Sequence, residues 1–308
     1  DPFHWMADKD DPRLIAYLQS ENAFTEQATA HLDALKQSLF DDIAARTKQT
    51  DLSVPIYIKH VDRSQFWYYT RTVEGLDYPI HCRAAAFTRD DMPDVSGSSP
   101  DEQILLDVNA LAAGHEFFAL GWSEVSASGR LLAYSVDVVG EERFDLYVKD
   151  LASGELLGEP IKGVGYGGSW VADDWLFYLR VDDASRPFEV WRHRLGASPD
   201  EDELVYREED ERFWLWLDSS RDESHVSIEA SSKLTSETLL IPQASPTDAP
   251  APSARGVRAL NTRSTSQEID CSSCTTQRIR SSSSRGPPWT PPARTTGRPS
   301  SADAMTAA

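Results

Sequence analysis

The feature that most constrains this chain is a pair of strand-like segments that recurs along its middle. LLAYSVD (131–137) is followed by FDLYVKDLASG (144–154), WLFYLRVD (175–182) by FEVWRHRLG (188–196), and HVSIEAS (225–231) by ETLLIPQ (237–243). The pairs begin at residues 131, 175 and 225, which are 44 and then 50 residues apart. Four short strands in every roughly 40–50 residues is the period of a β-propeller blade. The repeat therefore predicts propeller blades, and a β-sandwich with accidental spacing is the alternative.

An aromatic hairpin marks where the β part of the chain begins. Residues 66–72 are mainly aromatic and β-branched, which suits a pleated, half-buried surface. Residues 74–77 (EGLD) supply a turn, and Pro79 opens the return strand at 79–84, where a missing N–H matters least. No helical pattern separates the strands, which argues against parallel α/β units. Further strands are predicted at 54–59, 104–107, 117–121, 168–171 and 213–217, with a polar loop at 90–100.

The N-terminal segment, residues 1–50, has a helical pattern instead. Asp11 is placed to cap a helix whose first residue is Pro12. Apolar residues then recur roughly at helical spacing in two runs. We expect a pair of helices that packs on another part of the protein rather than a ligand site. The apolar positions are Leu14, Ile15, Leu18 and Ala23 in the first run and Leu32, Leu35, Leu39 and Ile43 in the second.

Charge and cysteine content limit the partners of the chain. A formal net charge of −20 over 308 residues argues against a nucleic-acid partner, because phosphate contacts need lysine and arginine. No run approaches the roughly 18–20 apolar residues of a membrane span, so no membrane partner is expected. Three cysteines (Cys82, Cys271 and Cys274) do not make a disulfide scaffold, so we expect a reduced, cytoplasmic setting. The acidic runs at 201–203 and 208–211 are interpreted as solvated loops, although they could steer basic peptides.

The composition changes abruptly near residue 251. Residues 1–250 contain 22 Lys and Arg against 47 Asp and Glu, whereas residues 251–308 contain 8 Arg, no Lys and 3 acids. The second segment has 19 Ser and Thr among its 58 residues and a single aromatic residue, Trp289. Cys271 and Cys274 have CxxC spacing, but the chain offers no second pair to complete a four-cysteine zinc site. We therefore expect neither a metal nor a cofactor, and we expect residues 251–308 to be disordered.

A shifted reading frame explains this segment. Codons permitted for DCSSCTTQRIRSSSS (270–284), read one base earlier, encode LLVLHNAADSKFEL, which again resembles two strands joined by a turn. Extending the shift upstream through Ile269 gives GVEYSVDQPGDR, which joins directly onto LLVLHN. We interpret the residues from about Ala251 onward as out of frame. A sequencing error and a true mutation both remain open as its origin.

Several stretches together resemble oligopeptidase B, in the prolyl oligopeptidase family of serine peptidases. The resemblance covers roughly residues 1–250, and its most distinctive stretch is WYYTRTVEGLDYPIHCR at 67–83. It implies a seven-bladed β-propeller, of which residues 51–250 would form the first blades. The other stretches are DPFHWMAD (1–8), ILLDVNALAAGHEFFALG (104–121), YSVDVVGEERFDLYVKDLASG (134–154) and RPFEVWRH (186–193).

The resemblance also implies a second domain, an α/β-hydrolase that follows the propeller and is wrapped by a segment like residues 1–50. The family cleaves short peptides after Arg or Lys with a Ser-His-Asp triad, and its propeller admits only small, flexible substrates. No G-x-S-x-G motif occurs in the sequence, so we expect this catalytic domain to be missing. No catalytic, cofactor-binding or metal-binding residue is assigned, and the histidines are interpreted as structural or surface residues. They are His4, His31, His60, His81, His115, His193 and His225.

Two functions follow from this reading. The first is the N-terminal propeller portion of an oligopeptidase B-like serine endopeptidase, whose substrates are short basic peptides and which is inactive as the 308-residue chain. The second is a non-enzymatic propeller fragment that binds a peptide or protein partner. The lack of a triad fits both, so it does not separate them.

Overall fold

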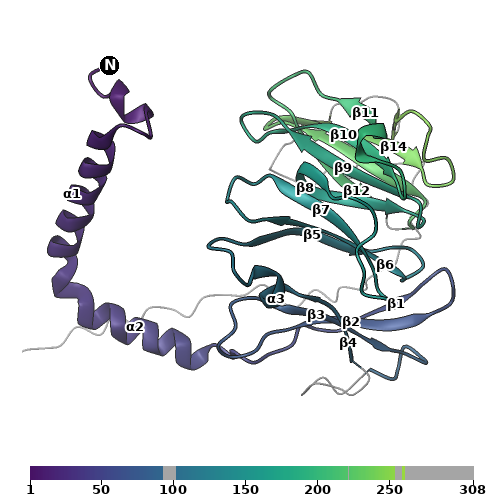
Figure 1. Cartoon of the computed structure of the whole chain (residues 1–308), viewed down its shortest axis with the longest axis horizontal. Coiled ribbons are helices and arrows are strands. Elements are labelled where there is room, and N and C mark those ends of the chain that lie inside the picture. The colour runs from purple at the N-terminus through teal and green to yellow at the C-terminus, as the bar shows by residue number, and fades with distance from the viewer. Residues whose placement is uncertain (93–101, 221, 254–258, 261–308) are drawn as a thin grey trace, which may run out of the picture. The chain divides into compact units, whose positions relative to one another are not determined.

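The computed structural model describes residues 1–92, 102–220, 222–253 and 259–260. Its strands form three antiparallel sheets that follow the order of the chain (Figure 1). A mainly β structure with helices at the N-terminus is confirmed.

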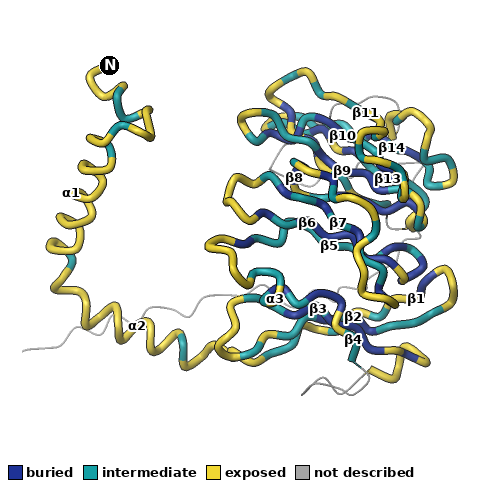
Figure 2. Tube along the Cα trace, in the orientation of Figure 1, coloured by how far each residue is buried: buried dark blue, intermediate teal, exposed yellow. Residues whose placement is uncertain are grey.

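The predicted N-terminal helices are confirmed with their cap. The first, α1 (Pro12–Thr29), begins after Asp11, whose side chain accepts a hydrogen bond of 2.9 Å from the N–H of Arg13. The second, α2 (Asp33–Arg46), follows the short 3₁₀ turn η2 (Ala30–Leu32), and another such turn, η1 (His4–Ala7), precedes α1. Neither α-helix contains a buried residue (Figure 2). Most of their large apolar side chains, among them Leu35 and Phe40, are exposed.

The first sheet contains the predicted aromatic hairpin. Its strands are β1 (Ile56–Lys59), β2 (Gln65–Arg71), β3 (Ile80–Ala85) and β4 (Glu102–Asp107), each paired with the next. The β2–β3 register places Trp67 opposite Ala84 and Tyr69 opposite Cys82, and all four side chains are buried. Gly75 takes a φ of 84° in the connecting turn, a conformation that favours glycine. A short helix that the sequence did not predict, α3 (Val108–Ala112), follows β4.

The second sheet is two four-stranded units that share one long strand. Its strands are β5 (Ala119–Val125), β6 (Leu131–Asp137), β7 (Phe144–Asp150), β8 (Ile161–Val171), β9 (Trp175–Val181), β10 (Pro187–Arg194) and β11 (Glu203–Arg207). The first part of β8 pairs with β7, through Ile161 opposite Leu146. From Gly168 onward, β8 pairs with β9 instead. The outer strand of one unit thus continues as the inner strand of the next.

The third sheet repeats the same order of strands. It contains β12 (Trp214–Ser219), β13 (His225–Ser231) and β14 (Thr235–Pro242), with the short strands β15 (Ala251–Pro252) and β16 (Ala259–Leu260) both paired to β14. The described residues thus form four consecutive four-stranded blades. The predicted strand pairs at 131, 175 and 225 are the central hairpins of blades 2, 3 and 4. Residues 251–252 pair with β14, although the sequence assigned residues 251–308 to a disordered tail; the rest of that tail, apart from Ser253 and β16, lies outside the described residues.

The acidic runs, interpreted as solvated loops, enclose a strand. Glu201 ends the 3₁₀ turn η3 (Pro199–Glu201), and Glu203 is the first residue of β11. An outer strand keeps one edge in water, so alternating charged side chains do not prevent its pairing. The loop interpretation was therefore wrong for Glu203.

The apolar core lies between neighbouring blades. On β9, Leu176 and Tyr178 pack into the cluster shared with blade 2, whereas Phe177 and Leu179 pack into the cluster shared with blade 4. Both faces of this strand are buried, which explains its continuous apolar run. On β13 the buried residues alternate, with Val226 and Ile228 in the core and Glu229 exposed.

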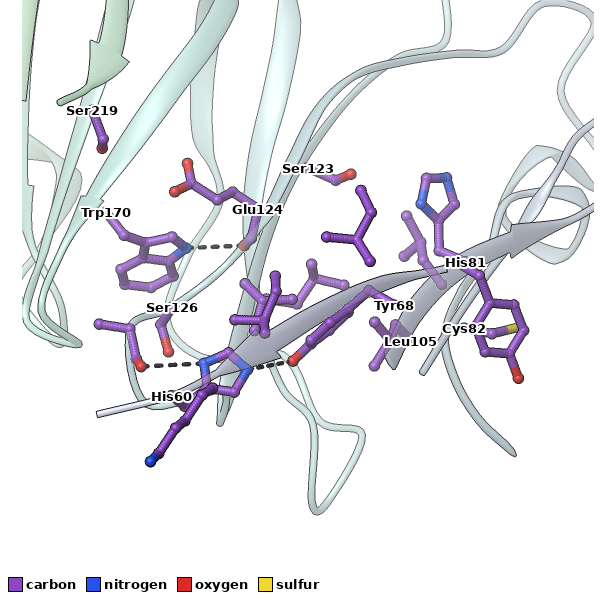
Figure 3. A pocket seen from close by; sticks show the side chains of 18 of the residues that line it. His60, Tyr68, His81, Cys82, Leu105, Ser123, Glu124, Ser126, Trp170 and Ser219 are labelled. Atoms are coloured by element: carbon purple, nitrogen blue, oxygen red, sulfur yellow. Dashed lines mark hydrogen bonds between the residues drawn. The ribbon is translucent and has the colours of Figure 1, made fainter. Parts of the chain in front are cut away.

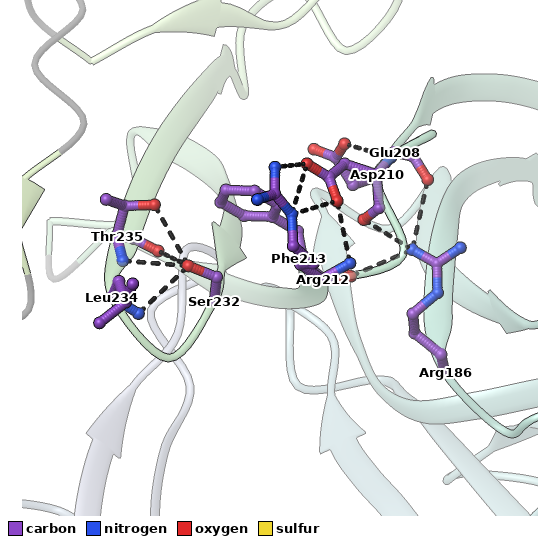
Figure 4. Close-up of polar contacts among 8 residues, drawn as sticks. All are labelled: Arg186, Glu208, Asp210, Arg212, Phe213, Ser232, Leu234 and Thr235. Carbon is purple, nitrogen blue, oxygen red and sulfur yellow. Dashed lines mark hydrogen bonds and ion pairs between the residues drawn. The ribbon is translucent and has the colours of Figure 1, made fainter.

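A buried arginine fixes the connection between blades 3 and 4. The guanidinium of Arg186 donates to the backbone carbonyls of Glu208, Asp210 and Phe213 at 3.4, 3.3 and 3.1 Å (Figure 4). Its Nε also donates to the Asp182 carboxylate at 2.9 Å. One side chain therefore satisfies three carbonyls of the segment that leads into β12.

Candidate functional site

A pocket of about 440 Å³ lies between the first sheet and the inner strands of the following blades (Figure 3). Its lining includes Ile58 of β1, Glu124 of β5, Trp170 of β8 and Ser219 of β12. The turns that follow β1, β5 and β12 contribute further residues. A pocket of this size, mainly apolar with a few polar groups, is the usual form of a small-ligand site.

His60 closes one corner of the pocket. Its Nδ1 lies 3.2 Å from the carbonyl oxygen of Ala127, and its Nε2 lies 2.7 Å from the hydroxyl of Tyr68. A carbonyl can only accept, so Nδ1 carries the proton and the Tyr68 hydroxyl donates to Nε2. Burial lowers the pKa of His60, and the nearby positive charge of Arg83 lowers it further. His60 is therefore a neutral residue that joins blade 1 to the turn after β5.

Arg83 also connects blade 1 to the turn after β5. Its Nη1 donates to the carbonyl of Gly129 at 2.6 Å and to the Tyr68 hydroxyl at 3.2 Å. Gly129 takes a φ of 74°, and a Cβ there would lie 2.8 Å from the imidazole of His60. The close approach of the turn to His60 therefore requires glycine at this position.

Glu124 lines the pocket with a carboxyl group whose pKa is raised and which has no ion-pair partner among the described residues. Burial raises the pKa of its carboxyl to about 7, and the negative charges of Asp218 and Glu223 contribute to the rise. No ion pair within the described residues reaches Glu124. Its backbone carbonyl accepts a hydrogen bond of 3.0 Å from the indole N–H of Trp170, which fixes the strand but leaves the carboxylate free.

His81 and Cys82 line the opposite wall without offering a nucleophile. Burial raises the pKa of the Cys82 thiol to about 11, and the negative charge of Glu102 adds to it. The reactive thiolate is therefore scarce at neutral pH. Burial also lowers the pKa of His81, so its imidazole is neutral.

The described residues contain one group with the composition of a triad but a different connectivity. The Ser224 hydroxyl lies 2.7 Å from both His225 Nδ1 and Asp222 Oδ1. In a triad the carboxylate orients the histidine, whereas here it accepts from Ser224 and Ser220. These hydroxyls lower the pKa of Asp222 to about 2. The group is therefore a hydrogen-bonded turn before β13 and not a nucleophile with its base.

The other histidines provide no triad either. His193 Nδ1 lies 2.6 Å from Asp202 Oδ1, and the Tyr178 hydroxyl donates to Asp202 Oδ2 at 2.9 Å, with no serine in the cluster. His4 and His31 lie in the N-terminal 3₁₀ turns, and His115 packs on Phe118. Across the ranges the structure describes, no group of three or more His, Cys, Asp or Glu could hold a metal ion. Cys271 and Cys274 lie outside those ranges.

Neither Glu124 nor His60 was singled out from the sequence as a binding residue. Glu124 is the acid of an ordinary strand sequence, GWSEV, and nothing local shows that this strand is an inner one. His60 was considered only as one histidine among seven.

No helix among the described residues is long and apolar enough to cross a membrane.

Four consecutive antiparallel blades with a pocket on their inner strands define a β-propeller module. A family model described as the prolyl oligopeptidase N-terminal β-propeller domain matches residues 1–274. The chain belongs to the prolyl oligopeptidase family. The match runs past Ala251, where the sequence predicts a change of reading frame.

Related proteins support this assignment. The chain is 37% identical over 260 residues to dipeptidyl aminopeptidase BI of Pseudoxanthomonas mexicana, covering 80% of this chain and 35% of that protein. It is 32% identical over 249 residues to protease 2 of Moraxella lacunata, with the same coverage. Oligopeptidase B from Leishmania major has a similar structure, with a TM-score of 0.71, 25% identity and coverage of 83% of this chain and 35% of that one. The chain thus spans about a third of the length of these relatives.

Proposed function

We propose that this chain is the N-terminal propeller portion of an oligopeptidase B-like serine endopeptidase that cleaves short peptides after Arg or Lys. The observation that carries the proposal is the match of the propeller family model to residues 1–274. The similarity in structure to oligopeptidase B from Leishmania major supports the choice within the family. In the longer enzyme, the propeller would restrict entry to short, flexible peptides.

The 308-residue chain itself is proposed to lack peptidase activity. Support comes from the sequence, which contains no G-x-S-x-G motif. It also comes from Asp222, Ser224 and His225, whose hydrogen bonds do not connect a carboxylate, a histidine and a serine in that order. The free, buried thiol of Cys82 fits a reducing compartment, and we propose the cytoplasm.

Hydrolysis of an arginine-amide reporter tests this function. We expect no turnover by the purified 308-residue chain, and we expect turnover by a longer protein in which this propeller is followed by a hydrolase domain. A neutral norleucine-amide reporter is the control for specificity. Activity of the 308-residue chain that persists through purification to homogeneity would overturn the proposed inactivity. A longer enzyme that prefers norleucine would overturn the proposed specificity.

A non-enzymatic propeller that binds a peptide or protein partner is the second candidate. The observation in its favour is the pocket on the inner strands, with a carboxylate that no described cation neutralises. Nucleotide sequence from related genomes separates the two candidates. A retained stop codon and tail would favour a binding protein, and an intact frame into a hydrolase domain would favour the enzyme.

A further inference from the structure

The pocket on the inner strands has apolar walls and acidic groups at one side. Ile58, Tyr68, Leu106, Val125 and Trp170 supply apolar surface from five different strands. Glu124 and Glu223 supply the carboxylates that line it. In Figure 3 no drawn hydrogen bond reaches the Glu124 carboxylate, which lies on the same side of the pocket as Trp170 and Ser219.

The negative charge at this side is uncompensated within the described residues. Asp218 and Glu223 both act on Glu124 as like charges. None of the three acids belongs to an ion pair between described residues, although Lys59 also lines the pocket. His60 is held neutral by its environment. A cation is therefore the complementary ligand for this side of the pocket.

We propose that the pocket binds a basic side chain of a peptide, with its aliphatic stem against the apolar wall and its cationic head at Glu124. Arginine and lysine have this combination of a long apolar stem and a terminal charge. The inference rests on the proposed function, which makes peptides with basic residues the substrates. It adds a site on the propeller itself, formed by strands of different blades.

A ligand pair that differs mainly in charge tests the site. Acetyl-arginine-amide and acetyl-citrulline-amide have nearly the same shape, but citrulline is neutral. Saturation-transfer NMR titrations of the 308-residue chain at pH 8 measure both dissociation constants. We expect the arginine ligand to bind at least tenfold more tightly. Equal affinity for the two ligands would overturn the inference.

Two variants with the same change in charge locate the effect. Glu124→Gln is expected to reduce the preference for arginine to less than about twofold. Glu155→Gln, at an exposed turn of blade 2, is expected to leave it unchanged. A preference that survives Glu124→Gln in a protein with a normal melting curve would contradict the proposal. If Glu124→Gln does not fold, Glu223→Gln replaces it, and a preference reduced less than twofold would contradict the proposal.

The outcome is separable from that of the proposed function. A longer enzyme that cleaves the arginine reporter, combined with a propeller that binds both ligands equally, would refute this site and leave the function standing. Binding of arginine by the propeller, combined with a longer enzyme that rejects the arginine reporter, would refute the proposed function and leave this site standing.

Discussion

The indole N–H of Trp170 donates to the backbone carbonyl of Glu124 across 3.0 Å, so the inner strand of blade 3 is tied to the inner strand of blade 2. Trp170 belongs to the apolar cluster between these blades, and Glu124 lines the pocket. The same contact thus links the packing of the blades to the position of the unpaired carboxylate.

Removing this hydrogen bond should destabilise the fold. Trp170→Phe keeps an aromatic ring in the cluster but leaves the carbonyl of Glu124 without its donor. We expect a loss of about 1–3 kcal/mol in the free energy of unfolding, measured by urea denaturation. Trp216→Phe is the control, because Trp216 is half exposed and should change stability by less than about 0.5 kcal/mol. Equal effects of the two substitutions would contradict the structural role of the bond.

The raised pKa of Glu124 predicts a stability that depends on pH. The folded-state pKa of about 7 exceeds the ordinary value of 4.5, so the unfolded chain releases this proton first as pH rises. Stability should fall between pH 4.5 and 7 and remain lower above pH 7. Glu124→Gln removes this loss and should stabilise the protein at pH 8 by up to about 3 kcal/mol, but much less at pH 5.

Other charged and titratable groups near Glu124 could also contribute to the pH dependence of stability. Asp218 and Glu223 raise its pKa, and Lys59, His60 and His81 line the same pocket. The measurement is thermal unfolding of the parent chain and the Gln variant across pH 4.5–8, the window of the shift. A stabilisation that is equal at pH 5 and pH 8 would show that the effect does not come from ionisation of Glu124.

Replacing isoleucine by alanine should have a large effect on stability in the core and a small one on the helices. Ile228 is fully buried between blades 3 and 4, so Ile228→Ala should cost about 2–5 kcal/mol. Ile43 on α2 is 60% exposed, so Ile43→Ala should change stability by less than about 0.5 kcal/mol. Urea denaturation measures both, and a large loss for Ile43→Ala would show that α2 packs on a partner surface.

Arg186 and Arg212 form a second matched pair. Arg186 is buried and bonds three carbonyls and a carboxylate, so Arg186→Gln should cost about 3–5 kcal/mol. Arg212 is exposed and pairs with Asp210 at the surface, so Arg212→Gln should cost less than about 1 kcal/mol. Comparable melting temperatures for the two variants would contradict the role of Arg186 in holding the connection into β12.

Local patterns were sufficient for much of the fold. The sequence alone predicts the cap at Asp11, the aromatic hairpin and the three repeated strand pairs, because each depends on neighbours close in the sequence. The strand β11 was missed because its acidic ends match a solvated loop equally well. The dual pairing of β8 was missed because it depends on two partners from different blades.

The candidate site was not predictable in the same way. Glu124, Trp170 and Ser219 are 46 and 49 residues apart along the chain and meet because each lies on the inner strand of its blade. Strand propensity does not indicate which strand of a blade is the inner one. The raised pKa of Glu124 results from burial and from acidic residues of blade 4, so no local sequence motif indicates it.

The nucleotide sequence across codons 245–275 tests the central claim most directly, namely that this propeller comes from a serine peptidase. We predict that a one-base correction near the codon of Ala251 opens a frame that continues the propeller and reaches a hydrolase domain with a G-x-S-x-G motif. Confirmation of the printed frame in independent clones, together with stop codons in both other frames, would contradict the account.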